Sequence, residues 1–237
     1  VDGDISHSIV VSNPVNVNSL GDYTITYNVQ DSSGNAAIQV SRTVTVVDTT
    51  KPVITLLGNT TITQEVFTPY VDAGAEATDS FEGDVTGNIV TVNPVNTTNL
   101  GTYVITYNVS DASGNAANQK VRNVTIVDTT APIITINGNP VINLAVGTPY
   151  TDLGASALDN FDGNITARIN TINPVDSNTV GVYTVRYSVS DDAGNIATEV
   201  TRTVNVVDTT RPIITLIGDA NVSIEAGTSY VDAGAIA

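Results

Sequence analysis

Apolar and polar residues alternate along most of this chain in short runs that turn-forming residues separate. In the run TYVITYNVS the alternation puts four apolar or aromatic residues on one face: Tyr103, Ile105, Tyr107 and Val109. Gly, Asn, Asp and Pro stand between the runs, and no segment has the period of a helix. Such alternation is typical of half-buried β-strands. The pattern therefore predicts an all-β fold of short antiparallel strands.

The same runs return with a fixed period. Pro52, Pro132 and Pro212 stand 80 residues apart in the phrases VVDTTKPVITL, IVDTTAPIITI and VVDTTRPIITL. A fixed period predicts a linear string of near-identical modules. The predicted division has four parts: 1–48, the C-terminal part of a repeat; 49–128 and 129–208, two complete repeats; and 209–237, the N-terminal strands of a further repeat.

Within 49–128 the turn signals divide the chain into about seven strands. The expected strands and loops, in order, are 52–58, 61–66, a strand or bulge over 68–79, a polar loop over 79–84, 88–95 interrupted by Pro94, 102–110, a loop over 111–115, and a closing strand over 116–128. Regularly spaced short strands with this alternation favour an antiparallel sandwich of the immunoglobulin type.

The tyrosines support a sandwich. All nine fall at three repeat positions: Tyr23/Tyr103/Tyr183, Tyr27/Tyr107/Tyr187 and Tyr70/Tyr150/Tyr230. The Gly-x-Tyr that opens a late strand resembles a tyrosine corner, in which the hydroxyl binds the backbone. Ile105 stands where antibody domains carry a disulfide cysteine. We therefore expect core and corner tyrosines rather than a ligand platform.

Four phrases carry a family resemblance. The phrases VDTTxPxITL, YxDxGAxAxD, DNFDGNIT and SDxxGNxA together span essentially the whole chain. The sequence resembles the bacterial immunoglobulin-like repeats of the hyalin-repeat type. The resemblance implies β-sandwich modules of long bacterial surface and secreted proteins, often adhesin stalks. It is specific for the fold and weak for any one function.

The charge balance limits the partners. The chain has 24 acidic and 8 basic residues, for a net charge of −16, and no cysteine. This excess argues against nucleic acid and anionic membranes, which select Lys and Arg. We also expect no membrane insertion, because no apolar run is long enough to span a bilayer. Small extracellular domains without disulfides need another stabilising element, and a metal ion is one option.

Most of the acidic residues recur at fixed repeat positions. In an immunoglobulin-type sandwich the linker, one inter-strand loop and the last hairpin loop meet at the same end, so their carboxylates are expected to converge at each inter-repeat joint. Oxygen ligands with intervening glycine suit Ca²⁺, and the lack of Cys argues against zinc. The alternative is that these acidic residues cap turns or carry solvent-exposed charge without binding a metal. The predicted ligands are Asp48, Asp79, Glu82, Asp84 and Asp111 at one joint; Asp128, Asp159, Asp162, Asn164 and Asp191 at the next; and Asp208 facing Asp2, Asp4 and Asp31 of a neighbouring molecule.

The partial repeats leave two interpretations open. The segment 1–48 lacks the first two strands of a repeat, and 209–237 consists of those strands. In one interpretation the chain is an excerpt of a longer covalent array. In the other, the tail of one molecule completes the head of the next by strand addition, which grows an open filament.

The favoured function is a calcium-stiffened extracellular or cell-surface filament or stalk, used to present an adhesive tip or build a matrix. The expected partner is another copy of the same protein, joined head to tail along a filament or covalent array. The alternative is a carbohydrate- or protein-binding module accessory to a secreted enzyme, for which Phe81 and Phe161 are the most plausible exposed aromatics. No enzyme is predicted, because His7 is the only histidine and no nucleophile–base pair or phosphate loop is present.

Overall fold

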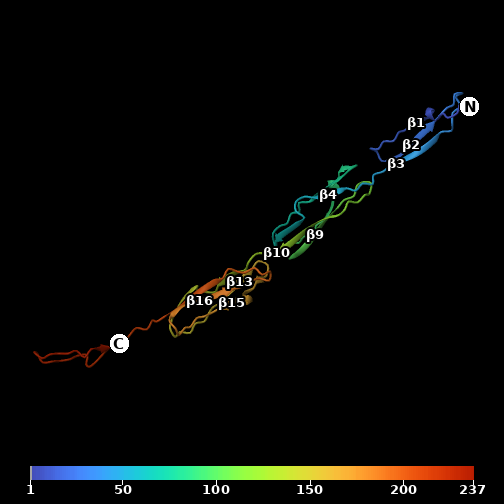
Figure 1. Cartoon of the computed structure of the whole chain (residues 1–237). Helices are drawn as coiled ribbons and strands as arrows, with labels where there is room; N and C mark the ends of the chain where they lie inside the picture. The colour runs from blue at the N-terminus through green and yellow to red at the C-terminus, as the bar shows by residue number, and fades with distance from the viewer. Residues whose placement is uncertain (1) are drawn as a thin grey trace. The chain divides into compact units, whose positions relative to one another are not determined.

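The computed structural model describes residues 2–237, which fall into two compact units: unit 1, which ends at residue 128, and unit 2, which spans 129–237. Each unit is described by itself (Figure 1). The predicted all-β fold class is confirmed, since every element longer than one helical turn is a strand. In the described residues, no helix is long and apolar enough to cross a membrane.

The complete repeat of unit 1 is a sandwich of two sheets. Its seven strands are β4 (Val53–Leu56), β5 (Thr61–Glu65), β6 (Ala75–Asp79), β7 (Gly83–Asp84), β8 (Val90–Val92), β9 (Gly101–Asn108) and β10 (Lys120–Val127). One sheet has the order β4-β6-β7 and the other the order β5-β10-β9-β8. A short 3₁₀ turn, η2 (Thr86–Asn88), leads into β8.

The two sheets differ in one respect from the expected antiparallel pattern. β9 and β10 pair antiparallel, as do β8 and β9, but β5 pairs parallel with β10 from Thr61↔Asn123 to Glu65↔Val127. Alternation along a strand reports which face is buried and carries no information on the direction of the neighbour. The parallel pair could therefore not be read from the pattern.

Two element boundaries also differ from expectation. The loop expected over 79–84 contains the two-residue strand β7, because Gly83, with a φ of 80°, lets the chain turn back onto Asp79. The closing strand begins at Lys120 rather than at 116, and only a single bridge, Ser110↔Ala116, precedes it.

The complete repeat of unit 2 has the same arrangement. Its strands are β11 (Ile133–Ile136), β12 (Val141–Ala145), β13 (Ala155–Asp159), β14 (Gly163–Asn164), β15 (Asn170–Ile172), β16 (Gly181–Ser188) and β17 (Val200–Val207), with η3 (Thr166–Arg168) before β15. The sheets have the orders β11-β13-β14 and β12-β17-β16-β15. β12 again pairs parallel with β17.

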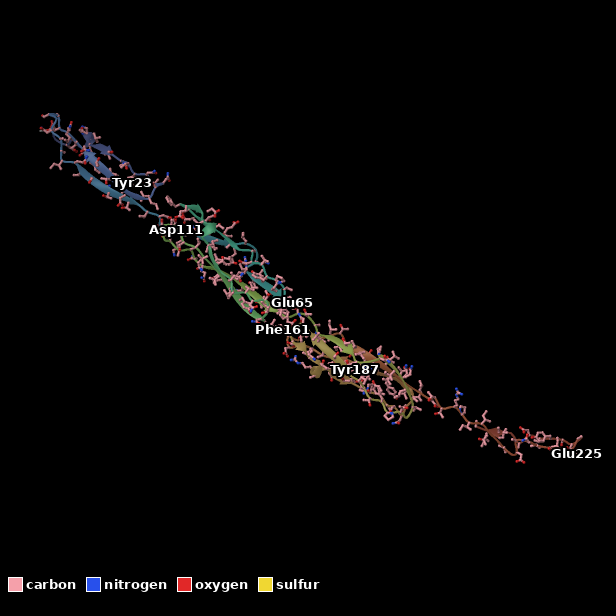
Figure 2. All side chains as sticks on the ribbon, turned by 180° about the vertical axis from the view of Figure 1, so that it is seen from behind. Tyr23, Glu65, Asp111, Phe161, Tyr187 and Glu225 are labelled. Atoms are coloured by element: carbon pink, nitrogen blue, oxygen red, sulfur yellow. The ribbon has the colours of Figure 1, made fainter. Side chains whose placement is uncertain are left out.

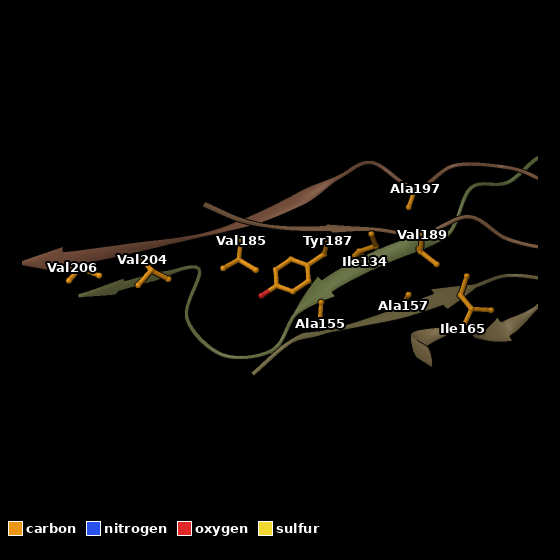
Figure 3. Close-up of a cluster of buried hydrophobic side chains, with 10 residues drawn as sticks. All are labelled: Ile134, Ala155, Ala157, Ile165, Val185, Tyr187, Val189, Ala197, Val204 and Val206. Atoms are coloured by element: carbon orange, nitrogen blue, oxygen red, sulfur yellow. The ribbon is translucent and has the colours of Figure 1, made fainter. Parts of the chain in front are cut away.

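The core of each complete repeat lies between its two sheets. In unit 2 the alternate residues Val185 and Tyr187 on β16 are fully buried in one apolar cluster, in which the ring of Tyr187 lies beside Ala155 of the opposite sheet (Figure 3). The equivalent Ile105 and Tyr107 of unit 1 are also 0% exposed. The prediction that these tyrosines belong to the core is confirmed.

The tyrosine corner is present in each of the three late strands. Tyr103 donates its hydroxyl to the carbonyl of Asn99 at 3.1 Å, and Tyr183 donates to Thr179 at 2.9 Å. Tyr23 on β2 (Gly21–Asn28) makes the same bond to Ser19 at 2.9 Å. Each bond fastens the start of its strand to the preceding turn, as the Gly-x-Tyr motif predicted.

A buried arginine joins the two sheets, and the sequence analysis did not identify it. Arg122 on β10 pairs with Asp72, and its guanidinium also donates to the carbonyls of Leu57, Asn59 and Gly74. The hydroxyl of Tyr107 donates to both oxygens of Asp72 at 2.8 Å. We call Arg122, Asp72 and Tyr107, and the equivalent Arg202, Asp152 and Tyr187, the arginine clasp of each complete repeat (Figure 2 labels Tyr187).

The incomplete segments keep only part of this arrangement. The first segment contains η1 (Ser6–Ser8) and a sheet of β1 (Val10–Ser12), β2 and β3 (Val40–Val46). The last contains the pair β18 (Thr215–Leu216) and β19 (Ala235–Ile236). Arg42 on β3 and Asp232 have the repeat positions of the clasp residues, and both are exposed. No second sheet covers either segment in the described residues.

Candidate metal centre

Three carboxylates meet at one end of the complete repeat in unit 1. Asp48 lies in the linker after β3, Asp79 is the last residue of β6, and Asp111 (labelled in Figure 2) begins the loop after β9. One carboxylate oxygen of each lies within 4.8 Å of the others. We call these three residues the aspartate trio. Asp79 and Asp111 are each 6% exposed.

Local turns hold each member of the trio in place. Asp79 Oδ1 accepts hydrogen bonds from the backbone N–H groups of Phe81 and Glu82, at 2.7 and 3.2 Å. Asp48 Oδ1 accepts from the N–H and the hydroxyl of Thr50, at 2.9 and 2.6 Å. These short-range bonds fix the side chains before any cation binds.

Asn115 holds the third carboxylate and also contacts the linker. Its N–H donates to Asp111 Oδ1 at 2.7 Å, and its side-chain amide donates to Asp111 Oδ2 at 2.8 Å. The same amide donates to the backbone carbonyl of Asp48 at 3.2 Å. Asn35, Asn115 and Asn195 recur with the period of the repeat, and this recurrence is the signal that the sequence analysis passed over.

The trio carries negative charge that no nearby cation neutralises. None of the ion pairs in residues 2–237 includes Asp48, Asp79 or Asp111. The N–H of Phe81 lowers the pKa of Asp79 below its ordinary value, so this carboxyl is ionised at neutral pH. Asp48 Oδ2 is buried without a hydrogen-bond partner among the described residues. A buried oxygen in this state is the arrangement that a bound cation satisfies.

Unit 2 repeats two of the three positions. Asp159 and Asp191 have ligand atoms within 4.8 Å of each other and are 4% and 7% exposed. Asp159 Oδ1 accepts from the N–H groups of Phe161 and Asp162, both at 2.8 Å. Its Oδ2 is buried and has no hydrogen-bond partner in the part of the chain that the structure describes.

The pKa of Asp191 results from two opposing effects. Burial raises this pKa, but hydrogen bonds from Asn195 outweigh burial, and the pKa lies below its ordinary value. Asp128, at the repeat position of Asp48, is the last residue of unit 1 and is buried.

The other predicted ligands in the two complete repeats have different contacts. Glu82 Oε1 accepts from the N–H of Ala112 at 2.7 Å, and Asp162 Oδ2 accepts from the N–H of Asp192 at 2.7 Å. Glu82 therefore joins the β6–β7 loop to the loop after β9, and Asp162 joins the β13–β14 loop to the loop after β16. Arg168 also pairs with Asp162 and Asp192, at 3.2 and 2.8 Å.

Two further predicted ligands cap the 3₁₀ turns. Asp84 Oδ1 accepts from the N–H of Thr86 at 2.9 Å, and Asn164 Oδ1 accepts from the N–H of Thr166 at 3.0 Å. Hydrogen bonds from Thr86 lower the pKa of Asp84. Neither residue belongs to a cluster of three ligands in residues 2–237.

The ligands predicted in the incomplete segments belong to no such cluster in the described residues. Asp2 accepts from the hydroxyl of Ser32, Asp4 from the N–H of Ser6, and Asp208 from the N–H of Thr210. Asp31 binds Asn35 in the way that Asp111 binds Asn115. The predicted meeting of Asp208 with these residues of another molecule stays a prediction.

Comparison with known proteins places the chain in a family. The family described as "Bacterial surface protein, Ig-like domain" matches residues 1–46, 54–126 and 134–206. The chain is similar to hyalin of Lytechinus variegatus, with 34% identity over 91% of this chain and 42% of the relative, and to hyalin of Strongylocentrotus purpuratus, with 34% identity over 84% and 17%. It is also 31% identical to the pesticidal crystal protein Cry22Aa of Bacillus thuringiensis, over 83% of this chain and 27% of that protein.

This chain spans less than half the length of each of these relatives. The likeness therefore concerns the repeats, in agreement with the resemblance found in the sequence. The three matches of the family cover most of the chain with the same period as the sequence phrases. This protein belongs to the family of Ig-like domains of bacterial surface proteins.

Proposed function

We propose that the chain is a spacer of an extracellular or cell-surface filament or stalk, in which calcium stiffens the joint that precedes each complete repeat. The aspartate trio carries this proposal. It supports a cation site because three carboxylates converge, two of them buried, without a basic partner among the described residues. Like charges this close repel one another, and a cation converts the repulsion into attraction.

The donor set favours calcium over other metals. The available ligands are carboxylate and carbonyl oxygens, which suit hard cations. Asp48, Asp79 and Asp111 offer fewer than the six to eight oxygens that Ca²⁺ takes, so water and backbone carbonyls would complete the shell. Mg²⁺ demands a tighter octahedron at shorter distances.

A cation held by the trio would restrict the linker. Asp48 belongs to the linker between β3 and β4, whereas Asp79 and Asp111 belong to loops of the complete repeat. A common ligand fixes the linker to the repeat that follows it, and the chain becomes stiffer along its length. A non-enzymatic spacer also agrees with repeats that present equivalent surfaces at each step.

The test is calcium binding by the 237-residue chain. Isothermal titration is expected to show calcium binding that Asp79→Asn weakens at least tenfold, together with a calcium-dependent rise in Tm and in the radius of gyration measured by X-ray scattering. Glu76→Gln is the matched control. This substitution also removes one negative charge from β6, but Glu76 is exposed. Equal calcium responses of the two variants, or no response of the parent chain to a chelator, would reject the metal site.

The second part of the proposal concerns self-association. In the complete repeats, the strands equivalent to residues 209–237 cover the sheet that carries the buried arginine. The aspartate of the clasp, which belongs to the same segment, neutralises that arginine. In the incomplete segments, Arg42 stands at the repeat position of the clasp arginine and Asp232 at that of the clasp aspartate, and both are exposed. We therefore propose that residues 209–237 of a second copy add to β3 of the 237-residue chain, so that copies join head to tail.

A charge exchange tests this contact. Arg42→Asp and Asp232→Arg are each expected to abolish concentration-dependent assembly in light scattering, and the double variant is expected to restore it. Electron microscopy would then show filaments for the parent chain and the double variant. A parent chain that stays monomeric, or single variants that assemble as well as the parent, would refute head-to-tail joining and leave the calcium proposal standing.

A further inference from the structure

We propose that each complete repeat carries tension along the chain, through a clamp formed by its parallel strand pair and its arginine clasp. In unit 1 the clamp consists of the β5–β10 ladder and Arg122 with Asp72, and in unit 2 of the β12–β17 ladder and Arg202 with Asp152. The inference depends neither on calcium nor on self-association, because each repeat contains the whole clamp.

The direction of the strands decides how a repeat resists pulling. β5 lies near the start of the repeat and β10 at its end, and they run parallel over five residue pairs. The bonds from Asn123 N–H to Thr60 O at 2.9 Å and from Val66 N–H to Val127 O at 2.8 Å extend this ladder at both ends. Tension on the two ends of the repeat draws β5 and β10 past each other along their length. All the ladder bonds then share the load, whereas a hairpin pulled from its open end loses them one at a time.

The arginine clasp lies on the path that the load takes. Tension enters through β4, which pairs with β6, and reaches β5 through the turn after β4. The guanidinium of Arg122, carried by the last strand, donates to the carbonyls of Leu57 and Asn59 in that turn. The last strand of the repeat thereby holds the connection between its first two strands.

The clasp also resists replacement by water. The Arg122 side chain is 1% exposed, and its guanidinium lies over the ring of Tyr107, 5.7 Å from the centroid. Its bonds to Asp72 and to the carbonyls are charge-assisted, which makes them stronger than bonds between neutral groups. A short extension of the repeat would break these bonds before water could reach the donors.

The same clamp in two repeats of one molecule supplies an internal control. Arg202 donates to the carbonyls of Asn139, Asn137 and Gly154, as Arg122 does at the equivalent positions. Single-molecule pulling of the full chain from its two ends is expected to give two unfolding peaks of similar force and similar contour length. In Arg122→Met, one peak is expected to fall to half its force or less, while the other stays unchanged.

A stability control separates load bearing from ordinary destabilisation. Val85→Ala creates a cavity at a residue that is 4% exposed and that lies between β7 and η2 in the chain, outside the β5–β10 ladder and the arginine clasp. At an equal loss of equilibrium stability in urea, Arg122→Met is expected to lower the unfolding force more than Val85→Ala does. Where Arg122→Met does not fold, Tyr107→Phe removes only the hydroxyl that holds Asp72 and takes its place.

A change of pulling direction gives the second measurement. Handles on Asn99→Cys and Thr129→Cys load the open end of the β9–β10 hairpin, which pairs antiparallel from Gly101↔Ile126. The repeat is expected to open at less than half the force that it withstands between its own ends. Equal forces in the two directions, or forces that follow equilibrium stability whatever residue is changed, would overturn the proposal.

Discussion

Arg122 and Asp72 form an ion pair across 50 residues of sequence, with the arginine side chain 1% and the aspartate side chain 14% exposed. A guanidinium withdrawn from water to this extent needs its counter-charge and its carbonyl acceptors in order to remain buried. The pair therefore makes the closure of the sandwich depend on a small polar network, in which Arg122 and Asp72 supply the two opposite charges.

Removal of the carboxylate is expected to destabilise the repeat strongly. Asp72→Asn leaves the guanidinium of Arg122 without its counter-charge and should lower the free energy of unfolding by about 3–5 kcal/mol. The measurement is urea unfolding of the full chain, followed through the tyrosine signal. Glu199→Gln is the control, because Glu199 pairs with Arg186 at 2.6 Å on the surface, and its loss should cost less than about 1 kcal/mol. Similar losses for both variants would contradict the role of the buried pair.

The second clasp predicts a dependence of stability on acid. Burial raises the pKa of Asp152, but the bonds from Tyr187 and Tyr150 and the charge of Arg202 outweigh it, so the folded pKa lies below the ordinary value of about 3.9. The stabilisation is therefore complete above about pH 4 and is lost as the pH falls through the lower folded pKa. Melting scans from pH 6 to pH 2 should show this decline. In Asp152→Asn the decline should be shallower than in the parent, and an equal decline in both proteins would contradict the role of Asp152.

The aspartate trio predicts that the effect of one substitution depends on calcium. In the presence of a chelator, Asp79→Asn weakens the hydrogen bonds from the N–H groups of Phe81 and Glu82, which lower the pKa of Asp79, while relief of repulsion within the trio opposes this loss, so the Tm should change little. In excess calcium the same variant should melt clearly below the parent, because it binds the ion more weakly and gains less from binding. Calorimetry under both conditions measures the difference. A variant that falls below the parent by the same amount with and without calcium would speak for a hydrogen-bonding role alone.

The turns after β5 and β12 have the same backbone conformation but different residues at one repeat position. Introducing glycine there and removing it are therefore expected to change the free energy of unfolding in opposite directions. Phe67 has a φ of 62°, and Gly147, its equivalent, has a φ of 81°. Gly147→Ala should cost about 1 kcal/mol, since an added Cβ meets no atom within 4 Å and only the left-handed backbone is penalised. Phe67→Gly should gain less than about 1 kcal/mol, because relief of the left-handed backbone is opposed by the loss of a ring that is only 53% exposed. Chemical denaturation of each variant measures both signs, and a loss from Phe67→Gly would show that the ring is needed for packing.

Several features of the fold and site followed from the sequence because they depend on local chemistry. Alternation predicted which residues of β9 face the core, and Gly-x-Tyr predicted the bond from Tyr103 to Asn99. The sandwich topology expected from the strand pattern put the linker and two acidic loops at one end, and the structure brings ligand atoms of Asp48, Asp79 and Asp111 within 4.8 Å of one another. The repeat boundaries and the ligands of the metal stay predictions.

Other features were hidden because they depend on long-range contacts. An arginine in an alternating strand is ordinarily solvated, so Arg122 gave no sign of burial beyond the recurrence of Arg42, Arg122 and Arg202 with the period of the repeat. The role of Glu82 differs from that of Asp79 through a contact with the distant Ala112, whereas Asp84 caps the turn at Thr86, two residues away. Position in an acidic loop does not distinguish a residue that faces its neighbours' carboxylates from one that binds a backbone amide.

The pairing of β5 with the last strand, β10, also sets the order of events when a repeat is made. The guanidinium of Arg122 reaches a carbonyl 63 residues earlier in the chain, so most of a repeat must exist before its sandwich can close. Contacts this distant in sequence slow folding, since a long loop is ordered before they form. As the chain emerges from the ribosome or an export channel, each repeat would remain open until its final strand appears and would then close in one step. Synthesis would thus add finished modules one after another, and neighbouring repeats of nearly the same sequence would have little time to exchange strands.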